Sequence, residues 1–255
     1  MTAMDGVSVP DAERRLRIDL AAAFRMVARL GLDDLIYNHI SVRVPGAEGQ
    51  FLINPYGLLF SELTASDLVR IDVEGNKLCD SPHAVNLAGF IIHSAIHGAR
   101  DDAVCVLHTH SDSLVAVSAL PEGLLPLSQF AMWFHRRLAW HDYEGVAIDA
   151  DERGRLVRDL GPHRAMLMRN HGILTIGRTV GEAFMLLYYA ERAARIQLKA
   201  QSAAGGRPLV LPPEEVCEKA ARQFWEQQGD IRIPGEREWP ALLRDLDRAD
   251  PGYRS

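Results

Sequence analysis

An apolar run that ends in two histidines constrains this 255-residue chain more than any other stretch; it reads Val104-Cys105-Val106-Leu107-His108-Thr109-His110. A continuous apolar run of this length is typical of a buried β-strand. Successive side chains of a strand point to opposite faces, so His108 and His110 leave the same face, about 7 Å apart along the chain. Two imidazoles placed in this way can bind one metal ion together.

A second apolar run supplies a candidate third ligand. Residues 165–168 are apolar and are followed by Arg169-Asn170-His171-Gly172, where Asn and Gly indicate a tight turn. The turn would hold His171 at the end of a strand. Three imidazoles with an open fourth position form the ligand set of a catalytic metal site. The sequence therefore predicts a metal centre made of His108, His110 and His171.

Imidazole ligands limit the choice of metal without fixing it. They suit Zn²⁺, and less selectively Fe²⁺, Mn²⁺, Co²⁺ or Ni²⁺, so we expect a divalent cation and most simply Zn²⁺. A Lewis acid stabilises the negative charge that develops on oxygen when a C–C bond breaks or a proton leaves carbon. The expected partner is therefore a small carbonyl or hydroxy-acid substrate.

Several motifs, taken in order, resemble the class II aldolase/adducin family. They are Tyr37-Asn38-His39-Ile40-Ser41-Val42-Arg43, Leu52-Ile53-Asn54-Pro55-Tyr56-Gly57, the His-Thr-His and Asn-His-Gly stretches, and the helix start Gly-Arg-Thr-Val-Gly-Glu-Ala-Phe. The resemblance covers roughly residues 12–204. It implies an α/β fold of three layers, α/β/α, around a central mixed, mainly antiparallel sheet. It also implies a homotetramer whose active sites lie at subunit contacts.

The chain departs from the sugar-phosphate aldolases of this family at the positions that matter for their chemistry. In those enzymes a Glu about nineteen residues before the first metal His is the acid/base, and a Ser-Ser pair before it binds phosphate. The corresponding residue here is Gly89, preceded by Leu87 and Ala88. The phosphate-binding Asn of the family aligns with His39, and Gln129 stands where the family has a Tyr proton donor. A conventional sugar-phosphate aldolase is therefore not expected.

A replacement acid/base should lie within hydrogen-bond reach of the substrate. Three candidates lie in the dense polar run 141–145, which is either a surface turn or, as in the family, close to the active site. The fourth, His93, shares a face of the predicted helix 85–99 with His97, and a hydrogen-bonded, partly buried pair is the favoured interpretation there. The candidate catalytic residues are thus Glu144, Tyr143, His93 and His141, and the candidate substrate-binding residues are His39, Asn54 and Gln129.

Three functions stay open at this point. The first is a metal-dependent lyase that acts by aldol cleavage, decarboxylation or epimerisation. The second is a non-haem Fe(II) oxygenase on the same scaffold. The third is an adducin-like assembly module without catalysis, because the stretch from Asn86 to His110 resembles adducin heads more than aldolases. Retention of the three histidines favours an enzyme.

Composition restricts the partners. A net charge of −6 and a pI near 5.9 argue against a nucleic-acid or membrane surface. No window approaches the ~18 apolar residues of a membrane span, and the first residues lack a signal-peptide pattern, so we expect a cytoplasmic protein. Three dispersed cysteines, Cys79, Cys105 and Cys217, fit a reducing compartment.

The predicted domain organisation has two parts. Residues 1–204 form the class II aldolase/adducin-like domain, with a long helix that starts at a Thr179-Val180-Gly181-Glu182 capping box. Residues 205–255 form a C-terminal helical extension and tail, which begins at the Gly205-Gly206 link. The charged tail from about Asp230 would dock on a neighbouring subunit or stay mobile. The aromatic stretch 130–140 is expected to be either a buried segment or a subunit contact.

Overall fold

The computed structural model describes residues 11–147, 149, 151–226 and 233–255. Within them a seven-stranded sheet runs in the order β3-β2-β1-β4-β7-β6-β5. β5 and β6 are parallel, and the other neighbouring strands are antiparallel, so the predicted mixed, mainly antiparallel sheet is confirmed. The strands are β1 (His39–Arg43), β2 (Gln50–Ile53), β3 (Val69–Asp72), β4 (Cys105–Thr109), β5 (Leu138–His141), β6 (Ala165–Met168) and β7 (Gly172–Gly177).

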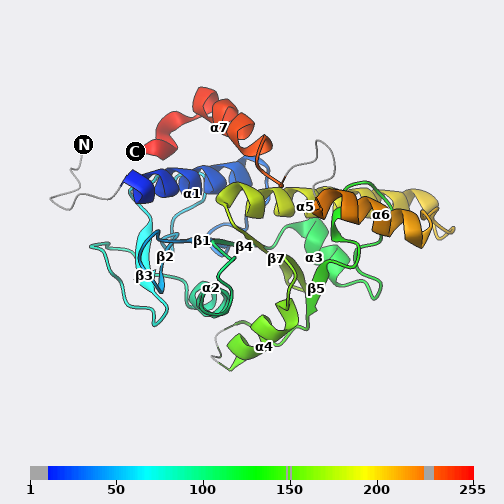
Figure 1. Cartoon of the computed structure of the whole chain (residues 1–255), viewed down its shortest axis with the longest axis horizontal. Helices are drawn as coiled ribbons and strands as arrows, with labels where there is room; N and C mark the ends of the chain where they lie inside the picture. The colour runs from blue at the N-terminus through cyan, green and yellow to red at the C-terminus, as the bar shows by residue number, and fades with distance from the viewer. Residues whose placement is uncertain (1–10, 148, 150, 227–232) are drawn as a thin grey trace.

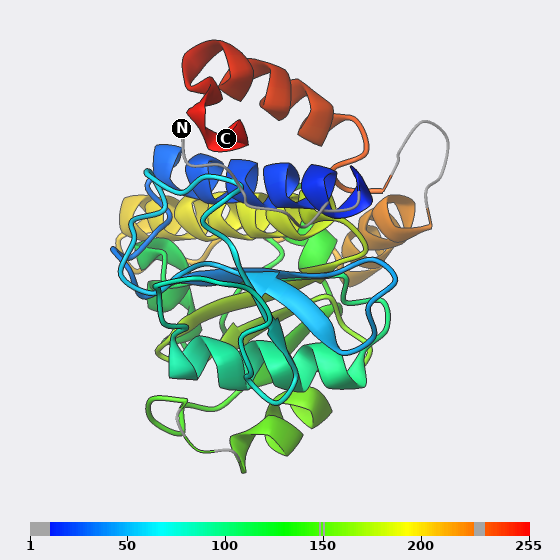
Figure 2. The same cartoon turned by 90° about the vertical axis from the view of Figure 1, so that its left-hand side faces the viewer.

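Helices cover both faces of this sheet (Figures 1 and 2). α1 (Asp11–Arg29) and α5 (Val180–Ala204) lie on one face, and α2 (Leu87–Ala99) and α4 (Glu152–Leu160) lie on the other. The short α3 (Asp112–Ser118) packs against α5. The predicted three-layer α/β/α fold is therefore confirmed.

The central strand β4 is apolar throughout because both of its faces are buried. Cys105 and Leu107 belong to the core under α1 and α5, whereas Val106 packs with Ile92 and Ile96 of α2 on the opposite face. Strand alternation therefore directs His108, two residues after Val106, toward the side of the sheet that carries α2 and α4. The next strand, β1, runs antiparallel to β4 with His39 opposite His108.

Two strands lie where the sequence analysis predicted none. β7 follows His171 directly, and β5 lies at the end of the aromatic stretch 130–140. The first part of that stretch, η1 (Ala131–Phe134), is a buried 3₁₀ helix, so the buried interpretation is the correct one for these four residues. Both strands extend the sheet beyond β4: β7 pairs with β4, and β5 is the edge strand.

The C-terminal extension is helical, as predicted, but its tail packs on its own chain. α6 (Glu214–Trp225) lies against η1, while α7 (Glu238–Ala249) and η2 (Pro251–Arg254) pack on the outer side of α1 (Figure 2). Tyr253 is fully buried there, and its carbonyl accepts a hydrogen bond from the Ala65 amide at 2.9 Å. Residues 233–255 thus pack on their own chain, whereas docking of the tail on a neighbouring subunit stays a prediction; its predicted start near Asp230 lies outside the described residues.

The start of α5 is held by Thr179, the N-cap of the predicted capping box, and by a buried ion pair; the reciprocal bond of the box goes from Glu182 to the Arg178 amide instead of the Thr179 amide. The Thr179 hydroxyl accepts a hydrogen bond from the Glu182 amide at 3.0 Å. The Glu182 carboxylate, 1% exposed, accepts one from Arg164 at 2.6 Å and one from the Arg178 amide at 2.7 Å. α5 is thereby anchored beside β6. Within the described residues, none of the helices has the length and apolar character needed to cross a bilayer.

Candidate metal centre

Three imidazoles from two strand ends converge on one point. The Nε2 atoms of His108 and His110 lie 2.9 Å apart, those of His110 and His171 lie 3.0 Å apart, and those of His108 and His171 lie 3.3 Å apart. Nitrogens at two corners of a tetrahedral zinc site are separated by roughly 3.3 Å. The spacing of these three nitrogens therefore suits a shared cation.

The sheet register brings the three residues together. β7 pairs with β4 in antiparallel fashion, with Ile173 opposite Thr109, so the residue just before β7 lies beside the end of β4. The turn that holds His171 depends on the residues on either side of it. Asn170 has a positive φ of 56°, and a Cβ at Gly172 would lie only 2.3 Å from the Thr109 carbonyl oxygen. This close approach explains the Asn-His-Gly sequence.

Hydrogen bonds fix the ring orientation of two of the histidines. The Nδ1 of His108 donates to the carbonyl of Ile173 at 2.9 Å, and the Nδ1 of His110 donates to the carboxylate of Asp34 at 3.0 Å. Carbonyl and carboxylate oxygens only accept, so in the neutral rings both protons are on Nδ1 and both Nε2 lone pairs are free. Such outer partners orient metal ligands and raise their basicity.

Burial favours the neutral form of two of the three imidazoles. It lowers the pKa of His108 well below its ordinary value, and the nearby imidazoles of His171 and His110 lower it further. Burial, reinforced by His110, lowers the pKa of His171 to about 4. Neutral imidazoles with free lone pairs are the form that binds a metal. The donor set therefore fits a divalent cation.

The centre opens on a cavity of about 740 Å³, of which His110 and His171 form part of the wall. Its other polar lining groups include Asp34, His39 and Asn86. None of the described residues that line it is a lysine or an arginine. Exposed apolar and aromatic side chains gather at its mouth: Tyr37, Tyr56, Leu87, Tyr143 and Val146.

Two of the predicted catalytic and substrate-binding residues line this cavity. The ring of Tyr143 lies 6.2 Å from that of His171, centroid to centroid. The ring of His39 stacks on that of His108, with 5.0 Å between centroids. A third, His93, lies one layer deeper, where its Nε2 is 2.8 Å from the Nδ1 of His39.

The two other predicted catalytic residues lie outside the cavity lining. The carboxylate of Glu144 accepts a hydrogen bond from Arg155 of α4 at 2.8 Å, and this bond lowers its pKa. The imidazole of His141 is buried between Asp159 at 2.8 Å and Glu152 at 3.3 Å. Partners on α4 thus hold both side chains.

The two remaining substrate-binding candidates, Asn54 and Gln129, also lie outside the cavity lining. The Asn54 side chain accepts a hydrogen bond from the Ile40 amide at 3.3 Å and donates one to the Asn38 carbonyl at 3.2 Å, so it joins two segments of the chain. Gln129 is exposed, just before η1. Within one chain, neither residue lines the cavity.

Some residues of the centre were missed by sequence reasoning. Asp34 lies in a loop seventy-six residues before His110, and nothing in the sequence connects the two. Ser41 could have been predicted from the sequence, because a strand directs the side chains of residues 39 and 41 to the same face. The structure places its hydroxyl against His93 and, at 2.7 Å, against the Nε2 of His97.

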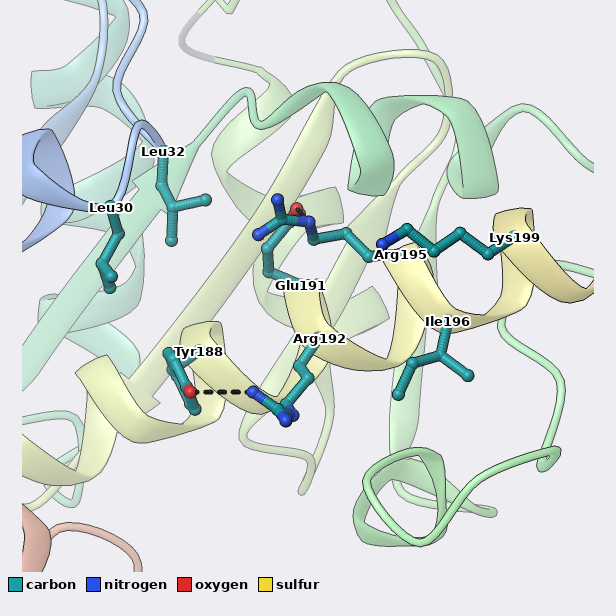
Figure 3. Close-up of a pocket in the computed structure, with 8 residues that line it drawn as sticks. All are labelled: Leu30, Leu32, Tyr188, Glu191, Arg192, Arg195, Ile196 and Lys199. Carbon is teal, nitrogen blue, oxygen red and sulfur yellow. Dashed lines mark hydrogen bonds and ion pairs between the residues drawn. The ribbon is translucent and has the colours of Figure 1, made fainter.

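A second hollow, of about 340 Å³, lies over α5 (Figure 3). Three exposed cations, Arg192, Arg195 and Lys199, line it together with Glu191. Arg192 donates a hydrogen bond to the Tyr188 hydroxyl at 3.1 Å, and Glu191 accepts one from Ser111 at 2.7 Å. Its lining holds no histidine or cysteine among the described residues, so it lacks the ligand set seen around His108.

An α/β/α fold with three converging histidines is the arrangement that the sequence motifs of the class II aldolase/adducin family predicted, and a comparison with family models gives the same family. Residues 18–198 match the family model described as the class II aldolase and adducin N-terminal domain. The chain belongs to this family.

The similar proteins include both aldolases and adducins. A protein of Caulobacter vibrioides with a provisional class 2 aldolase name is 48% identical over 245 residues, which cover 96% of this chain and 94% of that protein. Alpha-adducin of Rattus norvegicus is 38% identical over 98% of this chain, which spans 35% of the adducin. Among solved structures, an L-fuculose 1-phosphate aldolase from Glaciozyma antarctica is similar, with a TM-score of 0.84, 27% identity, and coverage of 100% of this chain and 97% of that one.

Proposed function

We propose that this protein is a divalent-metal-dependent lyase of the class II aldolase type, acting on a small carbonyl or hydroxy-acid substrate. The observation that supports this most directly is the convergence of the three Nε2 atoms, within 3.3 Å of one another, beside a cavity of about 740 Å³. A buried metal site without a cavity would be structural. This one has room for an organic molecule.

In this proposal His108, His110 and His171 hold the cation. When bound, such a cation acts as a Lewis acid that stabilises negative charge on a substrate oxygen. Asp34 holds the His110 ring, and the Ile173 carbonyl holds the His108 ring, so that both Nε2 atoms stay directed inward. The phenol of Tyr143, at the cavity mouth, is the group placed to donate a proton or hydrogen bond to substrate.

The lining argues for a substrate without a phosphate group. Phosphate sites in proteins use lysine, arginine or clustered backbone amides. The described lining of this cavity contains no lysine or arginine. This supports a lyase other than a sugar-phosphate aldolase, although a solved relative carries the name L-fuculose 1-phosphate aldolase.

Elemental analysis of the purified protein tests the proposal. We expect about one divalent metal ion per chain, and we expect His108→Ala and His171→Ala to lose it. His163→Ala is the matched control, because His163 lies before β6 and does not line the cavity. Zinc would support the lyase, whereas iron together with oxygen uptake would support an oxygenase. A chain that takes up no metal even when Zn²⁺, Fe²⁺ or Mn²⁺ is supplied would overturn the proposal.

A second candidate function is an adducin-like assembly module. It is favoured by the 38% identity to alpha-adducin over nearly the whole of this chain. A module of this kind needs no metal. The metal analysis therefore separates the two functions, provided that folding is confirmed by circular dichroism.

We also propose that the protein is a homotetramer whose subunit contacts lie near the cavity. Exposed apolar side chains of the cavity lining support this, since Leu87 and Val146 are 56% and 69% exposed. Exposed apolar side chains that gather in one region commonly mark a protein contact. Light scattering after size exclusion measures the mass directly. A monomer at micromolar concentration would contradict this part.

A further inference from the structure

A chain of hydrogen bonds runs from the backbone of the α2–β4 connection to the cavity. It starts at the Ala103 carbonyl and passes through His97, Ser41, His93 and His39 in turn. His97 and His93 lie on α2, whereas Ser41 and His39 lie on β1. All four side chains are at most 3% exposed, and of the four only His39 lines the cavity.

The first bond fixes the direction of the whole chain. A carbonyl oxygen can only accept, so the Nδ1 of His97, 3.0 Å from the Ala103 oxygen, carries the proton. In a neutral ring the other nitrogen is then an acceptor. The Nε2 of His97 therefore accepts from the Ser41 hydroxyl at 2.7 Å.

The direction continues toward the cavity. With its proton given to His97, the Ser41 oxygen accepts from the Nδ1 of His93. The Nε2 of His93 must then accept from the Nδ1 of His39 at 2.8 Å. By the same reasoning the Nε2 of His39 carries no proton. Each step follows from the one before it, and the sequence ends at a ring that lines the cavity.

This direction of the hydrogen bonds requires neutral rings, and the surroundings of the rings favour that form. Burial lowers the pKa of His97, at the start of the hydrogen-bond chain, to about 3. No carboxylate is among the described hydrogen-bond partners of His39, His93 or His97. A proton added to any of the three rings would leave a positive charge buried without an opposite charge beside it. The neutral, one-directional arrangement is therefore the stable one.

The position of His39 depends on a glycine in the facing helix. A Cβ at Gly89 would lie 2.7 Å from the Cδ2 and 2.9 Å from the Cγ of the His39 ring. The ring of His39 therefore uses the volume that any larger side chain at residue 89 would need.

We propose that the Nε2 of His39 is a fixed hydrogen-bond acceptor for a substrate hydroxyl beside the histidine triad, and that Ser41, His93 and His97 are positioning residues that hold it in this tautomer. This inference rests on the proposed function, because the triad must bind the rest of the substrate. It narrows the substrate class to compounds with a free hydroxyl next to the metal-binding carboxylate or carbonyl, such as α-hydroxy acids.

Ligand binding to the Co²⁺-loaded protein tests the acceptor. Glycolate and methoxyacetate both offer a carboxylate and a neighbouring oxygen, but only glycolate can donate a hydrogen bond from that oxygen. Changes in the visible Co²⁺ spectrum report each dissociation constant. We expect glycolate to bind about tenfold or more tightly than methoxyacetate, because the ether leaves a buried acceptor unpaired.

The matched variants are Gly89→Ala and Gly98→Ala, both on α2. A methyl group at residue 89 must displace the His39 ring, whereas at residue 98 it meets no atom within 4 Å. We expect Gly89→Ala to abolish the preference for glycolate while still binding Co²⁺, and Gly98→Ala to keep both. Equal binding of the two ligands by the unaltered protein, or a preference that survives Gly89→Ala, would overturn the inference.

Nitrogen NMR of the metal-free protein tests the positioning residues separately. With ¹⁵N-labelled histidine we expect His39, His93 and His97 all to carry the proton on Nδ1. Ser41→Ala removes the acceptor of His93, so in that variant we expect His39 to carry its proton partly on Nε2, a change that a merely structural role would not produce. A proton on Nε2 of His39 in the unaltered protein would refute the inference. If Co²⁺ does not bind at all, the proposed function fails, and the NMR result still decides the tautomer.

Discussion

The carboxylate of Asp34 lies 3.0 Å from the Nδ1 of His110, which joins the loop after α1 to the end of β4. The carboxylate has no other partner among the described hydrogen bonds, and it is 44% exposed. Its contact with the ring is therefore the feature that keeps the His110 Nε2 turned toward His108 and His171.

We expect Asp34→Ala to weaken metal binding by about tenfold to a hundredfold, which is the usual cost of losing an outer partner of a ligand. Competition with a chromogenic chelator measures the affinity. Asp33→Ala is the control, since the neighbouring carboxylate does not bond to His110. Equal affinities for the two variants would show that Asp34 has no orienting role.

The buried ion pair at the start of α5 predicts a large loss of stability. Glu182→Ala removes the nearest carboxylate of the Arg164 guanidinium, which is 18% exposed and keeps only a longer contact with Asp102 at 3.5 Å, and it removes the acceptor of the Arg178 amide. Loss of one partner of a buried pair typically costs about 3–5 kcal/mol. Urea unfolding of the metal-free protein measures the change. The double variant Glu182→Ala with Arg164→Met should be less destabilised than the sum of the two single ones.

The C-terminal residues predict a second stability effect. Tyr253 is fully buried against α1 and donates a hydrogen bond to the carboxylate of Asp247 at 2.7 Å. We expect Tyr253→Ala to lower the free energy of unfolding by about 3–5 kcal/mol, as for other large core residues. Tyr253→Phe keeps the ring and should cost only about 1 kcal/mol. Thermal unfolding that hardly responds to Tyr253→Ala would mean that this segment is not part of the core.

Buried histidines predict a loss of stability in acid. The pKa of His97 falls to about 3 in the folded chain from the ordinary value of 6.5, so below pH 6.5 the unfolded chain binds a proton that the folded chain refuses. Its contribution to stability is present above pH 6.5 and decreases by up to about 1.4 kcal/mol per pH unit between pH 6.5 and 3.

Removal of the His97 imidazole should make the free energy of unfolding less dependent on pH in acid. We expect His97→Gln to reduce the stability difference between pH 6.5 and 4.5 by about 2 kcal/mol. Urea unfolding at both pH values in the presence of a chelator gives this difference, and His83→Gln on the partly exposed loop before α2 is the control. An unchanged difference in His97→Gln would show that His97 is not the group responsible.

Short sequence patterns were enough to predict the three histidines of the candidate metal centre. The apolar run that ends at His108 and the turn at Asn170 each identify a strand end, and period-two alternation places His108 and His110 on one face. The resemblance to a family then supplied the three-layer fold. The proximity of Asp34 to His110 could not be predicted, because it depends on how the loop after α1 crosses the end of β4.

Two other features were hidden for different reasons. The six residues of β7 follow His171 without a separating polar segment, so the turn and the strand could not be told apart by periodicity alone. The hydrogen-bonded set of His97, Ser41 and His93 comes from a helix and a strand whose facing sides are fixed only when both pack. The role of Gly89 emerges only from its distance to the His39 ring.

The pairing of β1 with β4 has a consequence for how the protein matures. His39 lies opposite His108 in this ladder, and His171 enters from a third strand on the far side of β4. A slip of one residue in either ladder would turn the imidazoles of one strand into the opposite layer. The three Nε2 atoms therefore converge only in chains whose strands have paired in this register, so a cation at this site would bind after the sheet has formed.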